Sequence, residues 1–109
     1  MRMWMIDASK LCRQHLLGEH GEIHKHRHNF VKKHKLYGRI GQIEPESMQS
    51  RHDELAKEMV SRGYNHKSPY EQPDVSYLGK FPKIDLNESQ KLLYARCEEC
   101  KRRENDTNN

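Results

Sequence analysis

The 109-residue sequence lacks any long apolar run, and hydrophobic residues make up only 33% of it. Its mean hydropathy is −1.18. A membrane-spanning helix needs about 20 consecutive apolar residues, so this absence excludes an α-helical membrane protein. The N-terminus also lacks the apolar stretch that a secretory signal peptide requires. We therefore expect the chain to stay in the cytoplasm and to have no membrane partner.

Cysteine is scarce and odd in number, with only Cys12, Cys97 and Cys100. Disulfide frameworks usually contain an even set, so three cysteines favour a reducing compartment. The length is limiting as well, because 109 residues leave room for one domain and no second core.

An excess of acidic charge is also absent. Lys and Arg number 20 against 16 Asp and Glu, which gives a net charge of +4, and 8 His are present. A basic balance favours an anionic partner, and nucleic acid is the usual candidate. Because the net charge is small, we expect a folded domain with a thin core and a polar surface.

Two helices are indicated by apolar spacing in the first two thirds of the chain. The first begins after Asp7, a candidate N-cap, and runs to about residue 34. The second lies between Pro45 at its first position and Gly63 just after its last. The predicted core faces of these helices are Leu16, Ile23 and Phe30 in the first, and Met48, His52, Leu55 and Met59 in the second.

A third helix is predicted over about residues 85–103, with Asp85 and Glu88 as one candidate capping box. No stretch shows the alternation of a strand, so we expect an all-α fold. It would be a compact three-helix domain over residues 1–103, followed by a disordered tail, 104–109. A long ordered loop, 64–84, would join helices two and three. Its aromatic side chains could stack on bases or pin the loop to the core; they are Tyr64, Tyr70, Tyr77 and Phe81.

A carboxylate and an imidazole fall on one face of the first predicted helix. His15 and Glu22 are seven residues apart, and each immediately precedes a core position, which places it about 100° from the buried seam. Groups at the edge of a core helix are suited to general acid–base chemistry. A solvated helix face is the alternative, and the spacing alone leaves both open.

Three blocks of sequence resemble a known enzyme family. They are QHLLGEHGEIHK at 14–25, VKKH at 31–34 and RHDELAKEMVSRGYNHK at 51–67. In order and approximate spacing they are similar to the pyrimidine-dimer DNA glycosylases of the phage endonuclease V type, over roughly residues 1–67. The resemblance implies a small helical DNA repair enzyme that excises pyrimidine dimers from duplex DNA and then nicks the abasic strand as a lyase.

The resemblance also implies the catalytic residues. In that family the nucleophile is the α-amino group of the first residue, an arginine follows it, and a helix-borne glutamate lies some twenty residues on. Those positions correspond here to Met1, Arg2 and Glu22. The bulky Arg2 should block removal of Met1, which keeps the register without processing.

The chemistry of an α-amino group suits this role. Its pKa is about 7.7–8.0 against about 10.4 for lysine, so far more of it is neutral and nucleophilic at pH 7. Attack on the sugar would leave an imine whose β-elimination breaks the strand, and Glu22 would stabilise the cationic sugar and assist proton transfer. The reaction needs no cofactor.

Basic residues near this centre are expected to hold DNA phosphates, which position the duplex rather than read its sequence. The resemblance gives this role to Arg2, His15 and Lys25, and Arg27, Lys32 and Lys33 later in the same helix are further expected contacts. The expected partner is duplex DNA with a damaged or abasic site, bound by a monomer.

Two groups of residues invite a metal interpretation. In HGEIHKHRH at 20–28, only His20 with His24, and His24 with His28, have the four-residue spacing that two ligands need on a helix. Cys97 and Cys100 offer half a zinc site, which Cys12 or a histidine would have to complete. Because these cysteines are predicted near a helix C-terminus, a redox role is disfavoured, and packing of Cys97 in the core is the default.

Two other functions remain open at this stage. One is a metal-dependent nuclease that uses the histidine cluster and is inhibited by EDTA. The other is a non-catalytic DNA-binding protein on the same scaffold.

Overall fold

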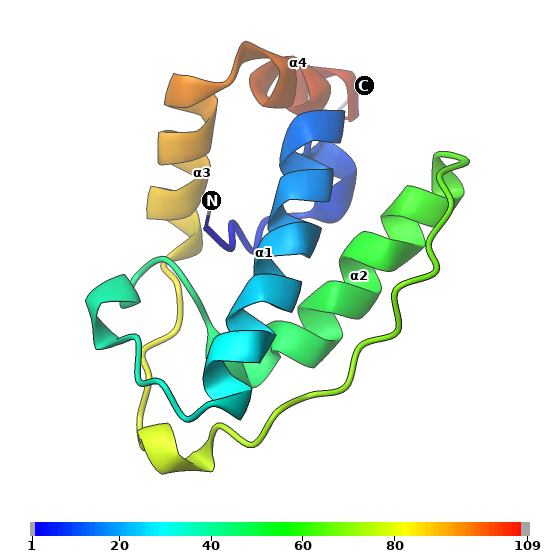
Figure 1. The fold of residues 1–109 in the computed structure, drawn as a ribbon. Helices are drawn as coiled ribbons and strands as arrows, with labels where there is room; N and C mark the ends of the chain where they lie inside the picture. Colours follow the sequence, from blue (N-terminus) through cyan, green and yellow to red (C-terminus); the bar gives the residue numbers. More distant parts are fainter. Residues whose placement is uncertain (1, 108–109) are drawn as a thin grey trace.

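The computed structural model describes residues 2–107, in which four α-helices are joined by short 3₁₀ turns and extended segments (Figure 1). The helices are α1 (Arg13–Val31), α2 (Met48–Ser61), α3 (Leu86–Arg96) and α4 (Glu98–Thr107). The 3₁₀ turns are η1 (Ala8–Lys10), η2 (Tyr37–Arg39), η3 (Pro45–Ser47) and η4 (Ser76–Leu78). Over these residues the only β-type pairing is an isolated bridge between Ile40 and Ile43. The all-α prediction is confirmed, but the expected three helices are four.

Helix α1 lies at the centre of the molecule (Figure 1). Helix α2 crosses it on one side, α3 lies on the other, and α4 lies across the end near η1. None of the helices between residues 2 and 107 is both long enough and apolar enough to cross a bilayer.

The first predicted helix starts later than expected. Asp7 does cap a helix, but its carboxylate accepts the Ser9 N–H at 3.0 Å and so caps the short turn η1. The chain then becomes extended at Leu11, and α1 begins at Arg13. The predicted seam of α1 is confirmed, because its three core residues are fully buried. The helix ends at Val31, and Lys33 then takes a left-handed φ of 65°.

The second predicted helix is confirmed with a shift at its start. Pro45 begins the turn η3, which leads directly into α2 at Met48. Gly63 follows the end of α2 with a φ of 86°, a conformation that glycine adopts without steric cost. All four residues of the predicted core face are buried.

The third predicted helix is broken in two. Asp85 caps α3 through the Glu88 N–H at 3.1 Å, as the capping box predicts. At Cys97 the backbone is extended, with φ −137° and ψ 107°, and a new helix begins at Glu98. Cys97 and Cys100 therefore lie at the N-terminus of α4, which corrects the expectation of a helix C-terminus. Helix α4 continues to Thr107, where the sequence suggested a disordered tail from residue 104; residues 108–109 lie outside the described residues.

The segment between α2 and α3 is held against the helices by hydrogen bonds. The backbone N–H of Gln49 donates to the Gln72 side chain at 3.0 Å, and the backbone N–H of Gln72 donates to the Gln49 side chain at 3.1 Å. Phe81 is buried, and the three tyrosines of the segment are partly buried against the core. These contacts favour the interpretation that the aromatic residues pin the loop.

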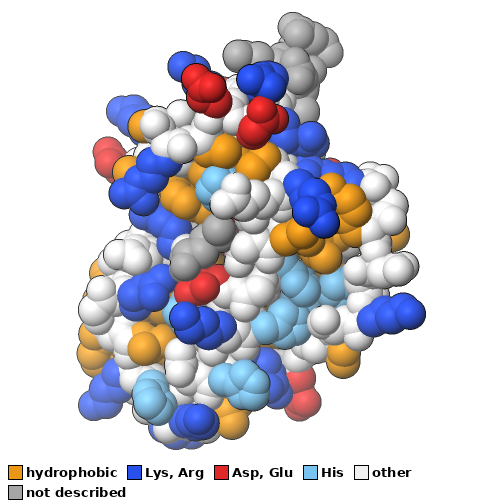
Figure 2. Space-filling view, turned by 45° about the horizontal axis from the view of Figure 1, so that its top comes forward, with side chains coloured by type: hydrophobic (Ala, Val, Ile, Leu, Met, Phe, Trp, Pro, Cys, Tyr) orange, Lys and Arg blue, Asp and Glu red, His pale blue; other side chains and the backbone are white. Residues whose placement is uncertain are grey.

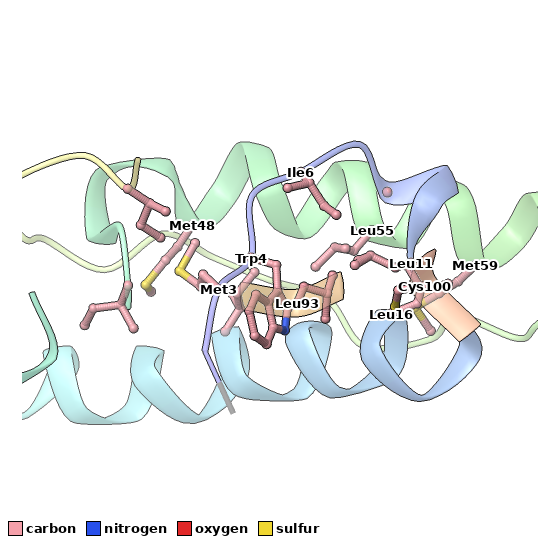
Figure 3. Close-up of a cluster of buried hydrophobic side chains, with 14 of the residues drawn as sticks. Met3, Trp4, Ile6, Leu11, Leu16, Met48, Leu55, Met59, Leu93 and Cys100 are labelled. Carbon is pink, nitrogen blue, oxygen red and sulfur yellow. The ribbon is translucent and has the colours of Figure 1, made fainter. Parts of the chain in front are cut away.

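The N-terminal segment forms part of the core (Figure 3). Met3 is fully buried and Trp4 is 4% exposed. The Met3 N–H donates to the Gln42 carbonyl at 2.9 Å, and the Ser89 hydroxyl of α3 donates to the Trp4 carbonyl at 2.6 Å. Met3 is thus fixed by the segment 40–44, and Trp4 by α3.

A buried ion pair joins α1 to α2. Both the Nε and an Nη of Arg51 donate to the Glu19 carboxylate, at 2.6 and 3.0 Å. The side chains are 1% and 0% exposed, and a third contact at 3.1 Å reaches the exposed Glu54. A charge in such a place is tolerated only while its partner is present.

Replacing Glu19 by Gln should therefore lower the free energy of unfolding by about 3 kcal/mol, the lower end for a broken buried pair, since Glu54 still contacts Arg51. The Glu54→Gln control removes only the exposed carboxylate and should cost less than about 1 kcal/mol. Urea unfolding of the two variants measures the difference. Equal losses would show that the buried pair is not the stabilising contact.

Candidate active site

Glu22 is buried on α1, although it is a carboxylate, with only 7% of its surface exposed. Its Oε1 lies 3.1 Å from Nε2 of His26, one turn further along α1, and 3.6 Å from Nη2 of Arg39 in η2. Burial lowers the pKa of His26, although the Glu22 carboxylate acts in the opposite direction. An acidic group is thus held between an imidazole and a guanidinium.

Arg2 is fixed beside this centre. Its Nη2 donates to the Gly41 carbonyl at 2.8 Å, and its guanidinium carbon lies 4.9 Å from the centre of the Trp4 ring. Such a cation–π contact holds the arginine at the surface of the core. Arg2 is also one peptide bond from Met1, which itself lies outside the described residues.

A hollow of about 660 Å³ opens beside Arg2 and Trp4. Its other lining residues are His15, Arg39, Gln42, Leu92 and Arg96. Arg39 also contacts Glu22, so the carboxylate lies next to the wall of this hollow. The volume falls within the usual range for a small-molecule site.

Three arginines give the hollow a strong positive potential. Burial lowers the pKa of Arg2, and the charges of Arg96 and Arg39 lower it further. Like charges are gathered in this way where an anion is to be bound. Lys and Arg side chains also outnumber acidic ones over the face drawn in Figure 2.

Two of these arginines, Arg39 and Arg96, were not identified by the sequence analysis. Arg39 lies in the short, glycine-containing segment 35–44 between the first two predicted helices, which the sequence analysis did not single out. Arg96 ends α3, and only the packing of α3 beside the N-terminal segment brings it to the hollow.

The other expected DNA contacts lie outside the hollow. Lys25 and Lys32 are exposed along and just after α1. The Arg27 Nε donates to the Glu71 carbonyl at 2.6 Å, so this arginine also holds the loop. Lys33 lies 3.7 Å from the exposed Asp74 carboxylate and 4.9 Å from the Tyr77 ring.

His15 lines the hollow but faces a second group of residues. Its Nδ1 lies 3.1 Å from Sγ of Cys12 and 3.6 Å from Sγ of Cys100. Burial lowers its pKa, so the ring is neutral at pH 7 and a weak partner for a phosphate. With Cys97, these residues form what we call the Cys/His cluster.

Four histidines form a separate cluster between α1, α2 and the following loop. Nε2 of His20 lies 2.9 Å from Nε2 of His66; His24 and His52 both pack against His20, and His52 also packs against His66. Burial and the neighbouring imidazoles lower the pKa of His20 to about 4. His20 and His24 lie in one group with His52, whereas His28 is exposed and lies outside that group. A patch of histidine side chains is visible in Figure 2.

The sequence model of one family matches most of this region. The family is described as pyrimidine dimer DNA glycosylase, and it matches residues 1–72 of the 109. The match contains Arg2, His15, Glu22 and Arg39 but ends before Arg96 and the last two cysteines. No curated protein and no solved structure matches the chain.

Proposed function

The chain belongs to the pyrimidine dimer DNA glycosylase family, and we propose that it excises pyrimidine dimers from duplex DNA and then cleaves the abasic strand as a lyase. The α-amino group of Met1 is the nucleophile and Glu22 the acid–base residue. The single observation that carries the proposal is the arginine-lined hollow, with Arg2 on its wall and the Glu22 carboxylate beside it.

The proposed reaction begins with the neutral amine of Met1, which has the lowest pKa of the protein's amines in model compounds. Its nitrogen forms a bond to C1′ of the damaged nucleotide while the glycosidic bond breaks and its electron pair leaves with the base. The nitrogen then loses a proton and the C1′–O4′ bond opens, with a proton going to O4′, which gives an imine that acidifies the 2′ hydrogen. Loss of that proton breaks the C3′–O bond and releases the 3′ strand.

Glu22 has two tasks in this scheme. Its negative charge stabilises the cationic sugar as the base departs, and its carboxylate moves the protons of imine formation and elimination. Contact with His26 and Arg39 keeps the carboxylate oriented. Burial strengthens its interaction with a cation, because little water screens the charge.

The arginines of the hollow hold the DNA backbone. The amine cannot reach C1′ of a nucleotide that is stacked inside a regular duplex. The target nucleotide must therefore be extruded, or the duplex strongly distorted. Arg2, Arg39 and Arg96 would bind the phosphates on either side of that nucleotide. Lys25, Arg27, Lys32 and Lys33 would contact phosphates further along the duplex.

Borohydride reduction tests the nucleophile directly. With the full chain on duplex DNA that contains one abasic site, we expect a covalent adduct that peptide mass spectrometry assigns to residue 1. Glu22→Gln should slow strand cleavage by at least about 100-fold, the usual contribution of a general acid–base group. Glu54→Gln, an exposed carboxylate on α2, is the matched control and should cleave normally. Undiminished cleavage by a chain with extra N-terminal residues would rule out the terminal amine.

The histidine cluster favours one second candidate, a metal-dependent nuclease. The same assay separates the two, because imine chemistry does not need a metal at the reacting atoms. EDTA added together with the substrate should leave both trapping and cleavage unchanged. Inhibition by EDTA without any trapped adduct would support the nuclease, and binding without cleavage would support a non-catalytic DNA-binding protein.

Arg96→Gln should weaken binding to abasic duplex DNA about tenfold, because it removes one charge-assisted phosphate contact. It should also lower the slope of log Kd against log salt concentration by about one unit. The control is Arg102→Gln, because Arg102 is a similarly basic residue that is paired with Glu99 on α4 and does not line the hollow. Fluorescence anisotropy over a range of salt concentrations measures both. Equal effects of the two substitutions would mean that the hollow does not bind the backbone.

A further inference from the structure

We propose that the Cys/His cluster, formed by Cys12, His15, Cys97 and Cys100, binds one zinc ion that connects the start of α1 to the junction of α3 and α4. The four ligand atoms all lie within 4.8 Å of one another. The cluster brings the pair Cys12 and His15 together with the pair Cys97 and Cys100, which lies more than eighty residues further along the sequence. The inference rests on these contacts and is independent of the proposed DNA chemistry.

Two separations between ligand atoms match a tetrahedral zinc site, and a third, 3.1 Å between Sγ of Cys12 and Nδ1 of His15, is shorter than such a site needs. Zinc binds sulfur at about 2.3 Å and nitrogen at about 2.0–2.1 Å, so a tetrahedron has edges of about 3.8 Å between sulfurs and about 3.6 Å between sulfur and nitrogen. Sγ of Cys12 lies 3.8 Å from Sγ of Cys97, and Sγ of Cys100 lies 3.6 Å from Nδ1 of His15. Three cysteines with one histidine are a common structural zinc set.

The two pairs have equivalent local structures. Cys12 is the residue before α1 and His15 is in its first turn, while Cys97 is the residue before α4 and Cys100 is in its first turn. Backbone N–H groups and the positive end of the helix dipole stabilise thiolate at such positions, whereas burial raises the pKa of the Cys100 thiol to about 12, so its deprotonation would depend on the metal. One such N–H, that of Cys12, donates to Sγ of Cys100 at 3.2 Å.

A disulfide explains the cluster less well. The sulfurs of Cys12 and Cys97 are 3.8 Å apart, whereas a disulfide bond is about 2.05 Å long. All three cysteines are free, and a disulfide would leave one cysteine and the histidine unexplained. A single zinc ion uses all four groups.

The zinc ion would have a structural role, because four protein ligands leave no open position for substrate or water. It would also affect the candidate active site, since His15 lines the hollow and its ring lies 5.9 Å from that of Trp4. Two of the ligands lie beyond residue 72, where the family match ends. The metal would thus attach the unmatched C-terminal part to the catalytic region.

Cobalt substitution of the full chain tests this site. When the metal is stripped from the acid-unfolded protein and the chain refolds with Co²⁺, we expect the ultraviolet thiolate-to-cobalt band and the visible bands of a tetrahedral site. Cys97→Ser and His15→Gln should each weaken zinc binding by more than about 100-fold, since even outer-shell changes cost 10–100-fold. His28→Gln, an exposed histidine on α1, should bind normally.

The thermal midpoint of the wild-type chain should also fall when the zinc ion is removed, because binding to the folded state alone stabilises it. The thermal midpoint and the wild-type cobalt spectrum together show whether the Cys/His cluster binds a metal, even if the cysteine variant fails to fold. A refolded wild-type chain that takes up no Co²⁺, or shows no thiolate band, would overturn the proposal.

The histidine cluster carries a second inference from different contacts. We infer that His20, His24, His52 and His66 form a separate site for a divalent transition metal such as zinc. Nitrogen atoms of the first three lie within 4.8 Å of one another, and His66 approaches His20 at 2.9 Å. Four imidazoles around one ion require separations of about 3.3 Å. His66 lies near this distance from His20 but is not in the group of three mutually close histidines, so binding all four would require its ring to move.

Unsatisfied nitrogen atoms point to a missing ligand in this cluster. Among the described residues, Nε2 of His24 and Nε2 of His52 are buried and have no hydrogen-bond partner. His52 is only 3% exposed, and its Nδ1 lies 3.1 Å from the Asp53 carboxylate. That contact places the proton on Nδ1 and leaves the Nε2 lone pair toward the cluster, as in carboxylate–histidine–zinc groups.

Zinc content separates this site from the Cys/His cluster. After equilibration with Zn²⁺ and desalting, the full wild-type chain should hold two zinc ions by mass spectrometry of the metal, and His52→Gln or His66→Gln should hold one. Cys97→Ser should also hold one, and the exposed His34→Gln control should hold two. Wild-type metal content in both His52→Gln and His66→Gln would refute the second site and leave the first untouched.

Discussion

Burial of the first residues is the constraint on which the rest of this structure depends. Met3 and Trp4 lie within the core rather than at a frayed end, and hydrogen bonds to Gln42 and Ser89 fix the backbone around them. Arg2 is consequently held over the Trp4 ring at the hollow. Under the proposed mechanism, in which the terminal amine is the nucleophile, the packing of these two apolar side chains would matter to function as much as to stability.

Local signals were sufficient to predict individual helices but not their breaks. The face of α2 and its ends at Pro45 and Gly63 follow from spacing and backbone preference, which the residues nearby determine. The extended residues Leu11 and Cys97 carry no such signal. Leu11 directly precedes a member of the Cys/His cluster and Cys97 belongs to it, and in this cluster Cys12 and Cys100 meet from distant parts of the chain. Tertiary contact at this point explains why a continuous helical pattern was interrupted.

The candidate site was partly predictable for the same reason. Glu22 was found through a resemblance that depends on a continuous block of sequence, and the structure places this residue beside the hollow. Arg96, His52 and His66 reach their sites by the packing of α3, α2 and the loop. Arguments from spacing compare residues within one element, so they paired His20 with His24 and Cys97 with Cys100. Cys12 or a histidine was named as a completing ligand for the cysteines, but which histidine it is, and the part of His52 and His66 in the other cluster, depend on tertiary packing.

Few apolar residues hold this chain together, and the structure compensates with polar connections at defined points. The buried pair of Glu19 and Arg51 fixes α1 against α2, and the histidine cluster lies along the same interface. The Cys/His cluster lies where the start of α1 meets the junction of α3 and α4. An ion pair is directional, and metal ligands at the two proposed sites would be so as well, because both require specific geometry where apolar contacts do not. A thin core connected in this way can hold Arg2, Arg39 and Arg96 close together despite their mutual repulsion, which is the arrangement that a phosphate-binding hollow requires.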